Sequence, residues 1–234
     1  MTKDTQVEAY LTRAKSWQDS PPPDCPRCPR LVEFRQLQQA ASPSAHNQPV
    51  ADFGVRDAQL LIVGLAPGRR GANTTGRPFT GDYAGRVLYP ALLAQGFARG
   101  DYGFVAGDGL ELIDCRITNA VRCLPPQNRP LPSEINHCRD YLAASVAASE
   151  RLRVILALGR IAHESLLRVF ERRLANHPFA NGKEHRLAEK IILVDSYHCS
   201  QYNIFTRLLS VEQFNLTIRR CRELVESFSG AESI

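Results

Sequence analysis

The sequence predicts an α/β fold: a single-domain, three-layer α/β/α arrangement with a central four-stranded parallel sheet. Three observations support this. Four short apolar runs are spaced along the chain, helical patterns separate them, and two of the runs pass directly into glycine-containing turns. Strands that alternate with helices at this spacing are typical of βαβ units, in which helices cover both faces of a parallel sheet.

The N-terminal part of the chain precedes the first strand. Apolar side chains at helical spacing predict a helix over 5–17. A rigid proline-rich loop, SPPPDCPRCPR, leads into a second helix over 30–41, and 41–54 is expected to be a linker or surface loop. We expect residues 1–58, which hold these helices and the cysteine loop, to pack on the α/β core.

The α/β core is predicted over the rest of the chain. Its strands are expected at 60–63, 115–119, 153–159 and 190–200, and its helices at 86–97, 131–150, 160–171 and 205–228. Ser133 is the expected N-cap of the helix over 131–150, because a hydroxyl can accept a hydrogen bond from a free N–H of the first turn.

Length and composition limit the possible classes of protein. The 234 residues, 44% hydrophobic and 23% charged, are typical of one globular domain over 1–234 and not of a disordered or collagenous chain. No apolar run reaches the roughly 18 residues of a membrane span, and the N-terminus lacks the apolar segment of a signal peptide. We therefore expect a cytoplasmic protein that is not bound to membranes. The net charge of +5 permits binding to nucleic acid without requiring it.

The seven cysteines are odd in number, which argues against a disulfide framework. Cys25 and Cys28 form a C-x2-C pair in the proline-rich loop, and Cys123 and Cys138 flank a second proline-rich turn. Four thiolates from these two regions could hold Zn²⁺ or a [4Fe–4S] cluster, and the spacing alone does not separate the two. Two alternatives to a metal or cluster site are that these cysteines are free thiols in loops, or that the protein is a thiol-based redox protein. Cys115 and Cys221 fit ordinary buried thiols.

Polar side chains gather where three predicted strands end. The glycine-rich loop 64–82 lacks both nucleotide-binding fingerprints, G-x-G-x-x-G and G-x-x-x-x-G-K-[ST]. It does carry Phe79, which could stack on a ring, and the carboxylate of Asp82. Asn119 ends the second strand and His198 ends the fourth. Because carboxyl ends of parallel strands share one edge of a sheet, these groups are expected to form one site, although each also has an ordinary structural reading.

Three segments together resemble the uracil-DNA glycosylase superfamily: GLAPGRRGANTTGRPFTGD (64–82), ITNAVRCLPP (117–126) and YHCSQYN (197–203). The likeness spans nearly the whole chain. It is greatest to the family 5 (type b) enzymes of bacteria and archaea, whose long G-A-N-x-T-G-R-x-F-T-G-D loop is specific. This resemblance implies that Cys25, Cys28, Cys123 and Cys138 hold a [4Fe–4S] cluster rather than zinc.

The resemblance also implies a function. The expected enzyme flips uracil, and hypoxanthine or other deaminated bases, out of double- or single-stranded DNA and hydrolyses the N-glycosidic bond, leaving an abasic site for base excision repair. No lysine lies near the motifs, so lyase activity is not expected. The implied residues are catalytic Asp82, Asn119 and His198; base-binding Gly68, Asn73, Phe79 and Asn119; and DNA-binding Ser200, Gln201 and Tyr202.

Two positions depart from the wider superfamily. Leu65 stands where relatives with the strongest uracil specificity place a polar water activator, a feature that fits family 5 and leaves Asp82 as the candidate to position water. Cys199 replaces a proline of the second motif. Because Leu65 removes the obvious general base, the alternative is a non-catalytic iron–sulfur or zinc protein of the same fold that binds DNA or a nucleotide.

Overall fold

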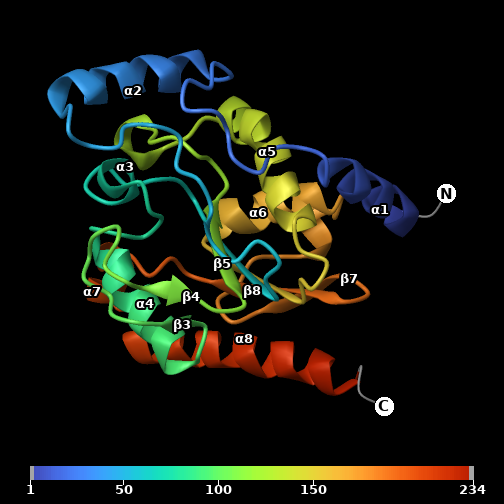
Figure 1. Ribbon diagram of the computed structural model, residues 1–234. Helices are drawn as coiled ribbons and strands as arrows, with labels where there is room; N and C mark the ends of the chain where they lie inside the picture. Colours follow the sequence, from blue (N-terminus) through green and yellow to red (C-terminus); the bar gives the residue numbers. More distant parts are fainter. Residues whose placement is uncertain (1–2, 232–234) are drawn as a thin grey trace.

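The computed structural model describes residues 3–231 and confirms the three-layer α/β/α architecture (Figure 1). Its main sheet has the strand order β1-β5-β2-β6-β8-β7. The four central strands run parallel, as predicted; they are β5 (Cys115–Asn119), β2 (Leu60–Gly64), β6 (Val154–Leu158) and β8 (Ile191–Ser196). Their residues are almost all buried, because helices cover both faces of the sheet.

The predicted four parallel strands form the centre of the sheet, and one antiparallel strand that was not predicted adds to each edge. These are β1 (Phe53–Gly54), inside the expected linker, and β7 (Glu184–Ala188), which forms a hairpin with β8. β1 has only two residues and therefore no periodicity. In β7 the exposed Glu184 and Arg186 alternate with the buried His185 and Leu187, as on a half-buried edge strand, and the prediction considered only continuous apolar runs.

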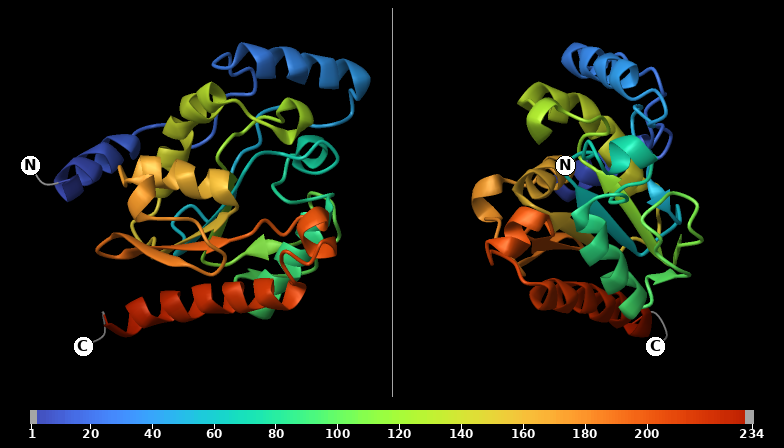
Figure 2. Two further views of the ribbon diagram at one scale, coloured as in Figure 1. Left: turned by 180° about the vertical axis from the view of Figure 1, so that it is seen from behind. Right: turned by 90° about the vertical axis from the view of Figure 1, so that its left-hand side faces the viewer.

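Helices form the two outer layers (Figure 2). One face of the sheet packs on α4 (Tyr83–Ala94) and α8 (Val211–Ala231), and the other on α5 (Pro132–Ala147), α6 (Arg160–Val169) and the N-terminal α1 (Lys3–Ala14). The remaining elements are short or peripheral: α2 (Pro29–Ala41), α3 (Ala72–Thr75), α7 (Gln201–Phe205), the β3–β4 hairpin (Ala98–Arg99 and Glu111–Leu112) and two 3-10 turns (Pro126–Asn128 and Leu174–Asn176). None of the described helices is long and apolar enough to cross a membrane.

Two predicted helix ends are wrong. Leu131, not Ser133, occupies the N-cap position of α5, because Pro132 takes the first helical position, and the Leu131 N–H donates to Glu134 instead (2.7 Å). The helix expected to begin at residue 205 begins at Val211 instead, as α8, and the separate short helix α7 ends at Phe205. Ser210 and Gln213 form a reciprocal capping pair that starts α8 at Val211.

A buried carboxylate attaches the N-terminal segment to the core. Asp52 accepts hydrogen bonds from Arg122, from Ser145 on α5 (2.7 Å) and from Thr118, and it pairs with Arg116 on β5 (2.7 Å). The Arg122 side chain is almost fully buried, so its charge has no access to water. Asp52 is therefore the counter-ion of the buried Arg122 and, together with Asp19 (2.8 Å), of Arg116.

We predict that Asp52→Ala lowers the free energy of unfolding by about 3–5 kcal/mol, because it leaves the buried Arg122 without its counter-ion, whereas Arg116 keeps Asp19. Urea denaturation measures the loss. The exposed pair Lys15–Glu150 provides the control, since Glu150→Ala should cost less than about 1 kcal/mol. Equal, small effects of both substitutions would contradict this account.

Candidate functional site

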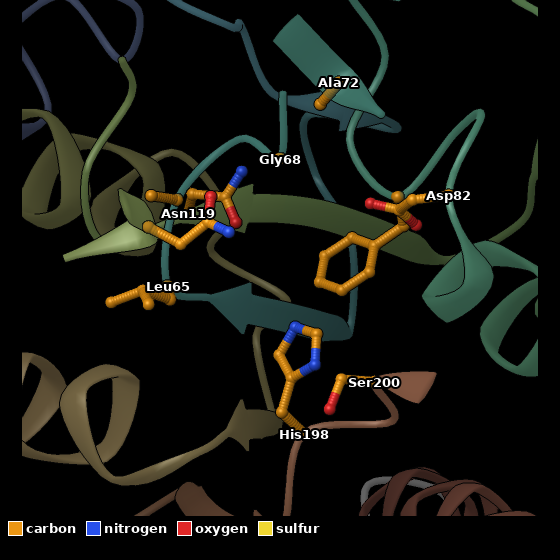
Figure 3. A pocket seen from close by; sticks show the side chains of 10 residues that line it. Leu65, Gly68, Ala72, Asp82, Asn119, His198 and Ser200 are labelled. Atoms are coloured by element: carbon orange, nitrogen blue, oxygen red, sulfur yellow. The ribbon is translucent and has the colours of Figure 1, made fainter. Parts of the chain in front are cut away.

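A cavity of about 260 Å³ opens at the edge of the sheet where the parallel strands β2, β5 and β8 end (Figure 3). This is the edge at which parallel α/β sheets bind their ligands. The residues that line the cavity come from the ends of these strands and the loops after them, and the predicted Phe79, Asp82, Asn119 and His198 are among them. The full lining is Leu65, Ala66, Gly68, Ala72, Phe79, Asp82, Asn119, Asn128, His198 and Ser200.

Strand pairing brings the first two groups together. Gly64, the last residue of β2, lies opposite Asn119, the last residue of β5. A Cβ at Gly64 would come within 2.5 Å of Asn119 Oδ1 and 2.7 Å of Phe79 Cζ, so both side chains use the space that a larger residue would fill. Phe79 has a positive φ of 54°, and Tyr102 Oη donates to its carbonyl oxygen (3.2 Å). The loop thus holds the ring against the strand end in a conformation that is costly outside glycine.

Asn119 is almost fully buried, and no hydrogen bond joins its side-chain amide to another group of the described residues. The amide atoms are not among the buried polar atoms that lack a partner, so they open on to the cavity. Because Asn119 lines the cavity, its unused acceptor and its two unused donors are available to a molecule bound there.

His198 completes the other side of the cavity. Its ring stacks on Phe79, with ring centroids 5.7 Å apart and planes 24° from parallel. Figure 3 shows the imidazole directed into the cavity, toward the side on which Asn119 and Asp82 lie. The carbonyl of His198 accepts a hydrogen bond from Asn203 Nδ2 (2.8 Å), which fixes the backbone at this point.

The environment of His198 favours the neutral imidazole. Burial lowers the pKa of His198 below its ordinary value, and the nearby negative charge of Asp82 opposes this shift only in part. Its Nδ1 atom is buried and has no hydrogen-bond partner among the described residues. Nε2 is therefore the ring nitrogen best placed to meet a ligand.

Asp82 has a different role for each carboxylate oxygen. One oxygen caps α4 by accepting the Gly85 N–H (3.3 Å). The other oxygen, Oδ2, packs against the turn that contains Gly68 and Gly71. A side chain at Gly71 would collide with it, because a Cβ there would lie 2.4 Å from Oδ2. The helix cap thus orients the second oxygen toward the cavity mouth, where it can accept a hydrogen bond or oppose a positive charge.

The structure does not bring Asn73 to the cavity. Its amide donates to Asn47 Oδ1 (2.8 Å), and its side chain faces a neighbouring polar hollow on the other side of α3. The base-binding role expected for Asn73 therefore has no geometric support. Asn73 instead ties the glycine-rich loop to the segment that follows α2.

The residues expected to contact DNA lie at the rim. Ser200 lines the cavity and caps α7 by accepting the Asn203 N–H (3.3 Å). Gln201 is exposed on the same helix, and so are two aromatic side chains, Tyr202 (74% exposed) and Phe205 (67%). Exposed aromatic rings beside a cavity mark a surface that docks on another molecule.

Sequence reasoning missed three lining residues: Ala66, Ala72 and Asn128. Asn128 enters from the turn after β5, where Gln127 and Asn128 both have φ of 56°. The signal was present in the sequence as Pro-Pro-Gln-Asn, because asparagine tolerates the left-handed conformation of turns. Ala66 and Ala72 offer no chemical signal, because they contribute only shape.

The four cysteines of the predicted metal site converge as expected. Cys25 and Cys28 precede α2, Cys123 follows β5 and Cys138 lies on α5; together with Leu31 and Tyr141 they line one small cavity. Burial and the neighbouring thiols raise the pKa of Cys28 and of Cys123 to about 12. This arrangement differs from a redox C-x2-C, which stands at the start of a βαβ unit.

The geometry suits one flat heterocycle with a polar edge: an aromatic ring for its face, an amide for its edge and an imidazole for a carbonyl oxygen. A family model described as the uracil DNA glycosylase superfamily matches residues 51–222. Type-5 uracil-DNA glycosylases of Thermus thermophilus and Pyrobaculum aerophilum are 38% and 36% identical, over 86% and 84% of this chain and 93% and 87% of their own lengths.

A type-4 uracil-DNA glycosylase of Archaeoglobus fulgidus is 33% identical over a smaller share, 64% of this chain and 69% of its own. The non-catalytic alternative loses its basis, because these relatives are named as glycosylases. The chain therefore belongs to the uracil-DNA glycosylase superfamily, in which it groups with the type-5 enzymes, and it is a DNA glycosylase.

Proposed function

We propose that this enzyme is a monofunctional glycosylase that removes uracil, and also hypoxanthine or other deaminated bases, from DNA and leaves an abasic site for base excision repair. We further propose that it acts as a monomer in the cytoplasm. The observation that carries the proposal is the amide of the buried Asn119, whose hydrogen-bonding groups are unused at the cavity shared by Phe79 and His198. None of the lining residues is a lysine, which supports hydrolysis without a Schiff base.

Asn119 is suited to the edge that deaminated bases share. Uracil presents N3–H beside the O4 carbonyl, and hypoxanthine presents N1–H beside O6, so one side-chain amide can accept and donate to either. The cavity volume of about 260 Å³ is that of roughly nine water molecules. Uracil, with its eight non-hydrogen atoms, does not need all of this space. Leu65 adds an apolar wall that makes no hydrogen bond to select one base. These features support a broad choice of base.

The proposed chemistry uses charge separation. As the N-glycosidic bond stretches, negative charge develops on the base and positive charge on the sugar. His198 Nε2–H and the Gly68 N–H donate to the base carbonyl that receives the electrons; each such donor is worth about 3 kcal/mol in comparable sites. The free oxygen of Asp82 opposes the sugar cation or orients the attacking water.

The base must first leave the DNA stack, which costs a few kcal/mol and least at a mismatch such as U·G. We propose that Gln201 and Tyr202 fill the vacated space and that Ser200 contacts the strand at the cavity rim. The exposure of Tyr202 beside the cavity supports this role, since an aromatic ring can replace base stacking.

We propose that Cys25, Cys28, Cys123 and Cys138 hold a [4Fe–4S] cluster. Zinc in a tetrahedral thiolate site needs sulfurs about 3.8 Å apart, given Zn–S bonds of about 2.3 Å. Among the described residues, no three of these sulfurs lie within 4.8 Å of one another, which fits a larger inorganic core. Arg35 Nη1 lies 3.7 Å from Cys123 Sγ, so it can donate to a cluster thiolate. The cluster would join the loop before α2 to the segment after β5 that leads from Asn119.

We predict that the protein converts a U·G duplex to a product that breaks at the uracil position only after alkali treatment. His198→Ala should slow single-turnover release of uracil by about 10²–10³-fold. Asn119→Ala should slow it comparably while affinity for DNA changes little, because base contacts specify and phosphate contacts position. Asn136→Ala, on the exposed face of α5, is the matched control. The proposal would be wrong if the wild-type protein gave no more alkali-dependent strand breakage than His198→Ala.

We predict a characteristic pH dependence from the lowered pKa of His198. If neutral His198 is the acting donor, single-turnover rate stays constant as pH falls from 8 and drops only below about 6.5, when the imidazole becomes protonated. The same shift lowers the free energy of unfolding at acid pH, since the unfolded chain binds this proton more readily. His198→Asn should lack the acid limb of the rate profile. A rate that rises with acidity would show instead that the imidazolium is active.

We predict that anaerobically purified protein is brown and contains about four iron atoms per chain. Cys28→Ala and Cys123→Ala should lose iron and visible absorbance together. Cys221→Ala, a buried thiol on α8 outside the cluster, should retain both. Colourless protein containing stoichiometric zinc would contradict the cluster.

A further inference from the structure

A second group of metal-ligating side chains lies outside the cavity and the cysteine cluster. It consists of His163 on α6, His185 on β7 and Asp195 on β8, which are neighbouring elements in the fold (Figure 1). All three are buried, with exposed fractions of 1%, 7% and 0%. One ligand atom from each lies within 4.8 Å of the others. None of the three has a part in the proposed glycosylase chemistry.

The two imidazoles face the same carboxylate. His163 Nδ1 lies 2.7 Å from Asp195 Oδ1, and His185 Nε2 lies 3.1 Å from Asp195 Oδ2. The other nitrogen of His163, Nε2, lies 2.9 Å from the carbonyl oxygen of His177. Both nitrogens of His163 therefore face oxygen acceptors, whereas a neutral imidazole has only one N–H. A neutral His163 therefore leaves one of these two contacts without a proton, a place that a cation at Nδ1 would fill.

We propose that this group is a binding site for a divalent cation of the zinc class, held by His163 Nδ1, His185 Nε2 and the carboxylate of Asp195. Two imidazoles and one carboxylate are a ligand set that zinc uses in proteins. The His177 carbonyl then serves as the outer partner: it accepts the Nε2–H of His163 and so fixes the tautomer that presents Nδ1 to the metal.

The fourth position of the site would be open to water. His177 lies beside the group, with its ring centroid 5.6 Å from that of His185 and its Nδ1 3.0 Å from the Arg173 carbonyl oxygen, but it is not one of the three residues whose ligand atoms lie within 4.8 Å of one another. The carboxylate is also held from outside, because the Ala180 N–H lies 3.4 Å from Asp195 Oδ2.

The cation would brace the segment that leads to His198. Gly182 N–H donates to the Asp195 carbonyl (2.8 Å), and Tyr197 N–H donates to Asn181 Oδ1 (2.9 Å). The loop before β7 is therefore already hydrogen-bonded to the end of β8. A metal bound by residues of α6, β7 and β8 would add a further link between these three elements. Its role is structural and does not depend on the proposed base specificity.

The test is titration of the full-length protein with Co²⁺ and with Zn²⁺. We expect one Co²⁺ equivalent whose spectrum lacks the sulfur-to-cobalt charge-transfer band of a cysteine site. The double variant Cys25→Ala, Cys28→Ala should retain this equivalent. His163→Gln and His185→Gln should each bind it at least about 100-fold more weakly, and His46→Gln, remote from both sites, is the matched control.

The change in Tm on addition of Zn²⁺ provides a second measurement, which remains informative if one variant folds poorly. Zn²⁺ should raise the Tm of the wild-type protein and of His46→Gln but not of His185→Gln. Equal metal binding by wild type and His185→Gln would overturn the proposal. So would a Tm of the wild-type protein that does not change when Zn²⁺ is added. Neither readout requires glycosylase turnover, so this failure is distinct from failure of the proposed function.

Discussion

The register that pairs Gly64 with Asn119 is the constraint on which the active site depends. Parallel pairing of β2 and β5 sets both residues at the same edge of the sheet, and the absence of a side chain at Gly64 lets Asn119 and Phe79 occupy that space together. His198 then stacks on the Phe79 ring from β8, two strands away. A slip of one residue in this register would turn Asn119 to the other face of the sheet.

The groups that line the cavity are held by the fold, whereas those at its rim are exposed to solvent. The sheet ends and the cap of α4 position Asn119, His198 and Asp82, and side chain–backbone hydrogen bonds fix the segment of His198 and the start of α4. The rim differs: α7 is a single short helix whose aromatic side chains extend into solvent. Under the proposed function, the positioned groups would meet the base and the exposed groups the DNA strand, as suits an enzyme that must extract its base before it can act.

Buried charge connects the site to the rest of the fold. Asp52 neutralises Arg116 within β5 and Arg122 just beyond it, so the strand that ends in Asn119 is anchored by the segment before β1. The cysteine cluster joins the same region from the other side, through Cys123. The elements N-terminal to the sheet therefore support the position of Asn119.

The sequence by itself determined the central parallel sheet, most of the helices and the identity of Asp82, Asn119 and His198 as neighbours, because continuous apolar runs mark buried strands and polar residues at their ends must share one edge. It could not determine β1, whose two residues pair with β5 far along the chain. The alternating pattern of β7 was present in the sequence, but the strand was missed because only continuous apolar runs were taken as strands. Nor could the sequence show that Asn73 turns toward Asn47, that Asn128 reaches the cavity, or that His163, His185 and Asp195 meet. Those facts depend on loop paths and on packing between distant elements, and only the tertiary structure decides them.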